Sequence, residues 1–326
     1  MGGLSLGVVV LVGALAYVVR PEWFGRTAQP LNESTPTLSL SELLAGNSPD
    51  WRVARLKENT AVLVVEFPNL SAQGEAMNRM AALLEKADAP RDRVLDDTAL
   101  AALITRSGDN LQTFYQGHDY NGAGLARFYR LVDGQTQVLN AQEQRMRQLL
   151  IAQGLLMASP EGLRPVGSQA VITYTAIQKD DPTTPLDETI DERRRESILR
   201  HEASHGRFFT RPAYAEHCRR LWREVLDDAQ REAFRRYLAT LGYDRKDEEL
   251  MVNEAQAFLL HTPDTRAFSA EGVGISDEVL AELRTRFWRT LPPEAEEPAQ
   301  AAAGRATSGG VTPAPVPAIQ PPANRP

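Results

Sequence analysis

The residues best suited to chemistry form a His-Glu-x-x-His motif, His201-Glu202-Ala203-Ser204-His205, within a stretch typical of a helix. Side chains four residues apart on a helix lie one above the other, so both imidazoles would project from one face. Two neutral imidazoles placed in this way can bind one zinc ion, and a catalytic zinc site keeps one position for water. Glu202 follows the first ligand directly and would serve as the general base toward that water.

The pattern around the motif predicts that it faces the interior of the protein. Residues 187–209 have a helical period, and Ile198, the two motif histidines and Phe208 fall on one stripe. The alternative is a charged helix that carries two surface histidines. We favour the metal site because the chain has 5 histidines and two of them occupy this motif.

A zinc site needs a third protein ligand, and the residues nearest the motif are poor candidates. The extended motif H-E-x-x-H-x-x-G-x-x-H fails, since Phe208 and Arg211 stand in place of its glycine and its last histidine. Cys218 lies on an apolar helical stripe and is expected in the core. His217, one position off that stripe, is expected at the surface.

Glu254 is the strongest candidate for the third ligand. It lies in a predicted helix, residues 247–261, on a face that is otherwise apolar. Buried carboxylates are rare unless they are paired, hydrogen-bonded or bound to a metal. An ion held by His201 and His205 would satisfy this requirement. The alternative is a partly buried face on which Glu254 pairs with an arginine.

Two apolar, β-branched runs, residues 61–67 and 170–177, predict buried strands. Helical patterns fill much of the remaining sequence. They cover residues 39–44, 71–84 with Ser71 as the N-cap, 95–104, 125–132, 139–155, 213–226 and 228–241. The glycine-rich connector 116–124 is expected to form a turn that exposes His118 beside Asp119, and the alternative is that these two residues are functional.

Composition excludes several classes of protein. The chain has 326 residues, of which 42% are hydrophobic and 24% charged, and its formal net charge is −7. A net acidic chain is a poor partner for phosphate backbones, so we expect no binding to nucleic acid. The single cysteine excludes an intramolecular disulfide framework and a zinc site made of cysteines alone.

The two ends differ from the middle of the chain. Residues 1–19 carry no charged side chain, and as a helix they would extend roughly 28 Å, close to the thickness of a bilayer core. They predict a transmembrane anchor or a signal peptide, and we favour an uncleaved anchor with an extracytoplasmic, periplasmic body. Arg20 and Arg26 would favour the opposite orientation. Residues 292–326 are rich in Pro, Ala and Gly and predict a disordered tail.

His201-Glu202-x-x-His205, followed on a later helix by Asn253-Glu254, resembles the gluzincin branch of zincin metallopeptidases. The phrases HEASHGRFFTRPAYAEHC and NEAQAFLLHTPD are also similar to an uncharacterised set of predicted bacterial exported proteins. The resemblance covers residues 161–291. It implies that His201, His205 and Glu254 hold Zn²⁺, while Glu202 polarises the water that attacks a peptide carbonyl. The interval between His205 and Glu254 is longer than in thermolysin-like enzymes.

The resemblance also implies an α+β, zincin-like fold: a mainly helical catalytic domain with a small sheet. The edge strand of that sheet would be the run at 170–177, just before the active-site helix. Members of this branch usually stabilise the oxyanion with a Tyr or His. His261 is the first candidate for that role, and Tyr243 and Tyr214 are alternatives.

These observations predict a zinc metallopeptidase that is tied to the membrane by its N-terminal segment and acts on peptide or protein substrates. The alternatives are a non-catalytic zincin-like binding module and a zinc amidase that acts on cell-wall peptide. The expected organisation is a leader (1–19), a linker (20–50), an α/β region (51–160), a catalytic region (161–291) and the tail (292–326). The role of residues 51–160, the substrate and the oligomeric state stay open.

Overall fold

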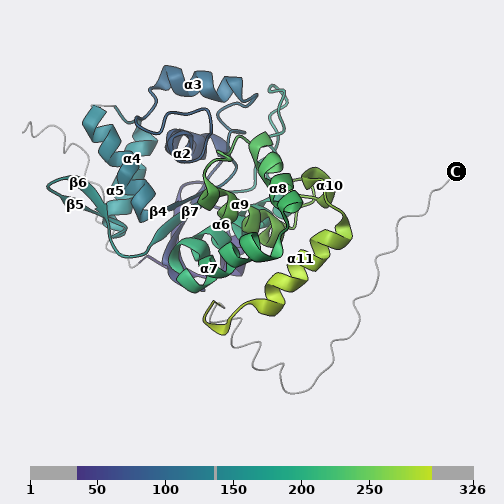
Figure 1. Ribbon diagram of the computed structural model, residues 1–326. Helices are drawn as coiled ribbons and strands as arrows, with labels where there is room; N and C mark the ends of the chain where they lie inside the picture. Colours follow the sequence, from purple (N-terminus) through teal and green to yellow (C-terminus); the bar gives the residue numbers. More distant parts are fainter. Residues whose placement is uncertain (1–34, 136–137, 296–326) are drawn as a thin grey trace, which may run out of the picture. The chain divides into compact units, whose positions relative to one another are not determined.

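A five-stranded mixed sheet lies between two groups of helices in the computed structural model, which describes residues 35–135 and 138–295 (Figure 1). In spatial order the strands are β1 (Thr37–Leu38), β2 (Arg52–Leu56), β3 (Asn59–Phe67), β7 (Ala170–Thr175) and β4 (His118–Asn121). β3 runs parallel to β7, whereas β2 and β4 run antiparallel to their neighbours β3 and β7. The mixed α and β composition agrees with the predicted α+β class.

Alternating side chains of β3 divide the core between the two faces of the sheet, as the period of a strand requires. Leu63, Val65 and Phe67 pack with helices α2 (Leu70–Leu84), α4 (Gly122–Gln135) and α5 (Ala141–Ala152). Val62 and Val64 face the opposite way and pack with α1 (Leu40–Ala45) and α6 (Glu192–Thr210). The motif helix α6 therefore packs on this face of the sheet, against β3, β7 and β4.

The C-terminal helices form a separate apolar core beside α6. They are α7 (Pro212–Arg220), the π-helical turn η2 (Leu221–Val225), α8 (Asp228–Thr240), α9 (Glu248–His261), α10 (Ala270–Val273), α11 (Asp277–Thr290) and the 3₁₀ turn η3 (Pro293–Ala295). α9 packs directly on α6. The remaining elements are α3 (Asp97–Arg106) and the hairpin of β5 (Leu156–Ser159) and β6 (Gly162–Pro165).

The expectation that residues 170–177 form an edge strand was wrong. β7 lies inside the sheet, between β3 and β4, and β4 is the end strand next to it. All six residues of β7 are buried, because helices cover both faces at this point. A continuous apolar run is the pattern of such an inner strand.

Several local predictions are confirmed and others are corrected. The helix predicted at residues 39–44 forms as α1, and Cys218 is buried in the C-terminal core as expected. Asn69, rather than Ser71, caps α2. His217 is buried rather than exposed, and its Nε2 lies 3.0 Å from the carbonyl oxygen of Phe287.

The predictions for the chain ends fall largely outside the described residues. The leader at 1–19 and most of the predicted tail belong to the parts that are not described. Within residues 35–135 and 138–295, no helix combines the length and apolar character that a membrane span needs. The division between 51–160 and 161–291 stays a prediction, although strands of both regions pair in the one sheet.

Two features hold α6 close to the sheet. Gly206 faces β3, and a Cβ at this position would lie 2.9 Å from both γ-carbons of Val62. The buried Arg195 guanidinium donates to Glu66 Oε1 at 2.6 Å, to Thr175 O at 3.2 Å and to carbonyls at the end of α1. Because a buried charge needs a full set of partners, this arginine fixes α6 against β3 and β7.

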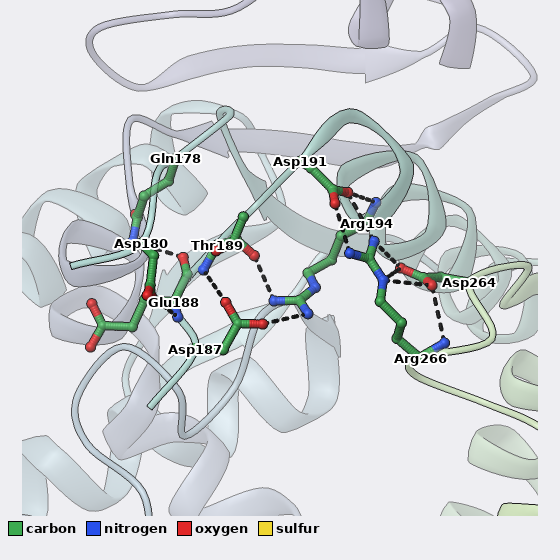
Figure 2. A network of polar contacts seen from close by, with 9 residues as sticks. All are labelled: Gln178, Asp180, Asp187, Glu188, Thr189, Asp191, Arg194, Asp264 and Arg266. Carbon is green, nitrogen blue, oxygen red and sulfur yellow. Dashed lines mark hydrogen bonds and ion pairs between the residues drawn. The ribbon is translucent and has the colours of Figure 1, made fainter. Parts of the chain in front are cut away.

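A polar network fixes the start of α6 against the segment that follows α9 (Figure 2). Asp191 caps α6 by accepting from the Arg194 amide at 2.7 Å. The Arg266 guanidinium bridges the carboxylates of Asp191 and Asp264, with contacts of 2.7 Å and 2.6 Å. Arg194 in turn donates to Asp187 Oδ2 at 2.8 Å. The network thereby joins the N-terminal end of α6 to the segment that follows the C-terminal end of α9.

The Arg266 network predicts a specific loss of stability in acid. Arg266 lowers the pKa of both Asp191 and Asp264 below their ordinary value. A depressed carboxyl pKa stabilises the fold above the unfolded value, about 4, and this stabilisation is lost as the pH falls through the folded pKa. The destabilisation caused by Arg266→Gln should therefore be larger at pH 6 than at pH 2.5 in urea denaturation. Arg236→Gln, at an exposed pair, is the control, and an equal effect of Arg266→Gln at both pH values would contradict the prediction.

Candidate metal centre

The packing of α6 on α9 brings the three predicted ligands together. His201, His205 and Glu254 each place one ligand atom within 4.8 Å of the others. His201 Nε2 lies 3.7 Å from Glu254 Oε2, and His205 Nε2 lies 3.7 Å from Glu254 Oε1. Ligands about 2.0–2.1 Å from a tetrahedral zinc ion are roughly 3.3 Å apart, so a small contraction would close this triad on an ion.

Neighbouring hydrogen bonds orient His201 in the way that a metal ligand requires. The Thr262 hydroxyl donates to the Ala257 carbonyl at 3.0 Å, and its oxygen lies 2.8 Å from His201 Nδ1. Because the hydroxyl proton is used on Ala257, Nδ1 is the donor in the second contact. His201 Nε2 then carries the free lone pair and points toward Glu254. A second hydrogen bond of this kind is typical of metal-ligating histidines.

Buried polar atoms without partners converge at the triad. His205 Nε2, Glu254 Oε2 and Glu202 Oε2 have no hydrogen-bond partner among the described residues. His205 is 0% exposed and Glu254 is 1% exposed. Unpaired polar groups in the interior cost free energy that nothing in this part of the protein offsets. One divalent cation held by His201, His205 and Glu254 would satisfy the unpaired ligand atoms of His205 and Glu254, so the residues present fit a zinc ion.

The protonation states suit metal binding. Burial lowers the pKa of His201 to about 3 and that of His205 to about 4, so both imidazoles are neutral at pH 7. Burial also raises the pKa of Glu254, while the facing His205 and Tyr243 act in the opposite direction. Metal ligands must be deprotonated, which these histidines already are.

Glu202 lies between the triad and a cleft of about 620 Å³. His201 and Glu202 line this main cleft together with aromatic residues such as Tyr243 and charged residues such as Lys86 and Arg266. Gly117 makes room for the carboxylate, because a Cβ there would lie 2.2 Å from Glu202 Oε1. Burial raises the pKa of Glu202 well above its ordinary value, and repulsion from Glu254 adds to the effect. Because Glu202 lies next to the candidate metal ligands, its carboxylate is well placed to act as a general base.

Asp119 lies beside the triad, where the sequence predicted an ordinary turn. The connector forms strand β4 instead, and His118 and Asp119 are both buried. Asp119 Oδ2 lies 3.6 Å from His205 Nε2, and Asp119, Glu202 and His205 form a second group with ligand atoms within 4.8 Å of one another. The connector 116–124 is polar and does not alternate as a strand does. The only feature of its sequence that pointed to a functional site was the pair of titratable residues His118 and Asp119.

The candidates for oxyanion stabilisation lie in different places. The structure does not place His261 among the residues that line the main cleft. Its Nε2 lies 2.9 Å from the Tyr214 hydroxyl, which also donates to Gln256 Oε1. Tyr243, in contrast, lines the main cleft and lowers the pKa of Glu254. Of the three, Tyr243 is thus the residue next to the metal triad and the cleft.

The triad predicts that purified full-length protein binds one zinc ion per chain. His201→Ala and Glu254→Ala should each lower zinc affinity by about 100-fold or more, since each removes a direct ligand. Removal of zinc with a chelator should lower the melting temperature of the parent and leave both variants unchanged. Metal analysis and thermal melts measure these outcomes.

Glu216→Ala is the matched control, because Glu216 is exposed and forms ion pairs with Arg219 and Arg223. Full zinc affinity in Glu254→Ala would show that another residue is the third ligand. Asp119, 3.6 Å from His205, would then be the first residue to test.

No known protein family, curated protein or solved structure matches this chain in sequence or fold comparisons. The resemblance to gluzincins therefore rests on the motif residues alone. What the site does is inferred from its own geometry and donor chemistry.

Proposed function

We propose that the protein is a zinc-dependent metallopeptidase of the gluzincin type. The observation that carries this proposal is the triad of His201, His205 and Glu254, with Glu202 beside it at the edge of a solvent-accessible cleft. Two imidazoles and one carboxylate are a typical donor set of catalytic zinc sites. Buried ligand atoms without hydrogen-bond partners favour a bound ion at the triad, because without one they would stay unpaired in the interior.

The metal and the side chains around it would each have a different role in hydrolysis. Zinc, when bound, would supply a Lewis acid at the base of the cleft. Glu202 would take a proton from the attacking water and later deliver it to the leaving amine. We propose Tyr243, rather than His261, as the donor to the oxyanion, because Tyr243 lines the main cleft next to Glu254.

The substrate class follows from the surroundings of the cleft. β4 ends the sheet and carries Asp119 to the metal centre, so its backbone lies beside the reaction site. End strands can pair with an extended peptide through main-chain hydrogen bonds. We therefore propose peptide or protein substrates that lie along β4. We further propose that residues 1–19 attach the protein to a membrane, with the body in the periplasm.

The decisive experiment is Glu202→Gln in the full chain. This variant should keep one zinc per chain but lose peptide hydrolysis by at least 10²-fold, because the general base is gone while the ligands stay. Hydrolysis would be measured on a mixture of unblocked and blocked peptides, and on cell-wall peptide. Unchanged hydrolysis in Glu202→Gln would overturn the proposed mechanism. Zinc binding without any hydrolysis by the parent would support a non-catalytic module instead.

Gly117→Ala tests the same role by a different route. The new methyl group would displace the Glu202 carboxylate, so hydrolysis should fall at least tenfold while zinc content stays at one per chain. Gly134→Ala is the matched control, since a Cβ at Gly134 meets nothing within 4 Å. If Gly117→Ala hydrolyses peptides at the parental rate, the position of Glu202 does not limit the reaction.

A further inference from the structure

One lysine of the main cleft is buried without a carboxylate partner. Lys86 is 5% exposed and lines the same cleft as His201 and Glu202. Buried lysines are rare in proteins unless they are paired with an opposite charge. Within residues 35–135 and 138–295, Lys86 forms no ion pair, and its ammonium donates one hydrogen bond, to the Leu241 carbonyl at 2.9 Å.

The arginines that line the main cleft, in contrast, are already neutralised. Arg194 pairs with Asp187 at 2.8 Å, and Arg266 pairs with Asp264 at 2.6 Å (Figure 2). Among the described residues that line this cleft, Lys86 is therefore the lysine or arginine whose charge has no ion-pair partner. An anion that enters the cleft would find its free counter-charge there.

The Lys86 ammonium has a defined position at the wall of the cleft. It lies 4.5 Å from the ring centroids of both Phe114 and Tyr115. A Cβ at Gly242 would lie 2.9 Å from Lys86 Nζ, so the nitrogen packs directly on the backbone at this point. Cation–π contacts and a single carbonyl offset only part of the cost of removing an ammonium from water. An ammonium has three donors, and those not used on Leu241 stay available to a ligand.

The nearest acidic side chain in this cleft does not neutralise Lys86. Burial lowers the pKa of Lys86, and the charge of Asp109 acts in the opposite direction. Asp109 also lines the main cleft, but its Oδ1 accepts from the Thr113 hydroxyl at 3.2 Å and forms no ion pair with Lys86. Asp109 thus contributes a distant charge rather than a direct partner.

Lys86 lies one bridged residue pair away from the metal centre. It pairs with Tyr243 in an antiparallel β-bridge, next to which the Ala87 amide donates to the Gly242 carbonyl at 3.0 Å. Tyr243 lowers the pKa of Glu254 and lines the main cleft as well. Bridged residues have Cα atoms about 4.5–5.5 Å apart, and an extended chain advances about 3.3–3.6 Å per residue. A peptide with a carbonyl at the metal can therefore bring a carboxylate to Lys86 within a few residues.

We propose that Lys86 binds a carboxylate of the peptide substrate in the main cleft, either the C-terminal carboxylate or that of an Asp or Glu side chain. The inference rests on the proposed function for the peptide nature of the substrate. It makes Lys86 a specificity-determining residue, so that peptides with a carboxylate close to the scissile bond are the preferred substrates. The contact is a charge-assisted hydrogen bond, which is stronger than one to a neutral amide.

The test measures binding of zinc-chelating probes, so that it does not depend on turnover. Zinc-loaded full-length protein is titrated by calorimetry with succinyl hydroxamates of Gln-Ala and Glu-Ala, each prepared with a C-terminal amide and with a free C-terminal carboxylate. The parent should bind a carboxylate-bearing probe at least about tenfold more tightly than the neutral Gln-Ala amide. A gain from Glu assigns the site to a side chain, and a gain from the free C-terminus assigns it to the chain end.

Lys86→Met should reduce this ratio to nearly one and keep one zinc per chain, because it removes the charge and keeps an unbranched side chain against Phe114 and Tyr115. Lys246→Met, at an exposed lysine, is the matched control and should keep the parental ratio. Asp109→Asn should not lower the ratio, since the charge of Asp109 repels an incoming carboxylate. The ratio compares probes on one protein, so a general loss of stability in a variant does not change it.

The remaining outcomes separate this inference from the proposed function. Equal binding of all probes by the parent, no binding of any probe, or a preference that persists in Lys86→Met would each overturn the inference. A preference that depends on Lys86, in a protein that hydrolyses no peptide, would support the inference and overturn the peptidase. Hydrolysis of peptides without a preference for a carboxylate would do the reverse.

Discussion

The concentration of buried acidic side chains between α6, α9 and β4 is the constraint on which the rest of the structure depends. Glu202 and Glu254 are almost completely removed from solvent, and Asp119 joins them from the sheet. Ionised carboxylates in a medium of low dielectric constant repel one another strongly and are poorly solvated. A raised pKa, which burial and the neighbouring Glu254 cause at Glu202, is one way in which the fold can keep them together. Binding of a cation, as we propose for His201, His205 and Glu254, is another.

The scaffold around this site is correspondingly rigid. Gly206 allows α6 to lie close against β3, and the many donors of Arg195 fix the same helix to the sheet. Arg266 ties the beginning of α6 to the segment after α9 (Figure 2). These contacts hold the helices that carry His201, His205 and Glu254 in one geometry. A preorganised site of this kind spends little free energy on rearrangement when it binds its ligand.

Much of the secondary structure could be predicted because it follows from local pattern. The helical period of α6 and α9 put His201, His205 and Glu254 on inward faces, and the structure brings these residues together. Strand order could not be predicted in the same way. β7 was expected at an edge, although its continuous apolar run matches the inner position that it occupies. That position depends on which segments pair with it, and pairing is a long-range property.

The sequence by itself determined the ligand types and their helical spacing, because residues i and i+4 on one helix are neighbours whatever surrounds them. Only the tertiary structure decided what stands opposite them. Asp119 lies on β4, more than 80 residues before His201, and Gly117 leaves room for the Glu202 carboxylate. Neither residue lies in a periodic pattern that marks its role. Their importance comes from strand pairing and helix packing, which bring distant segments within a few ångströms of one another.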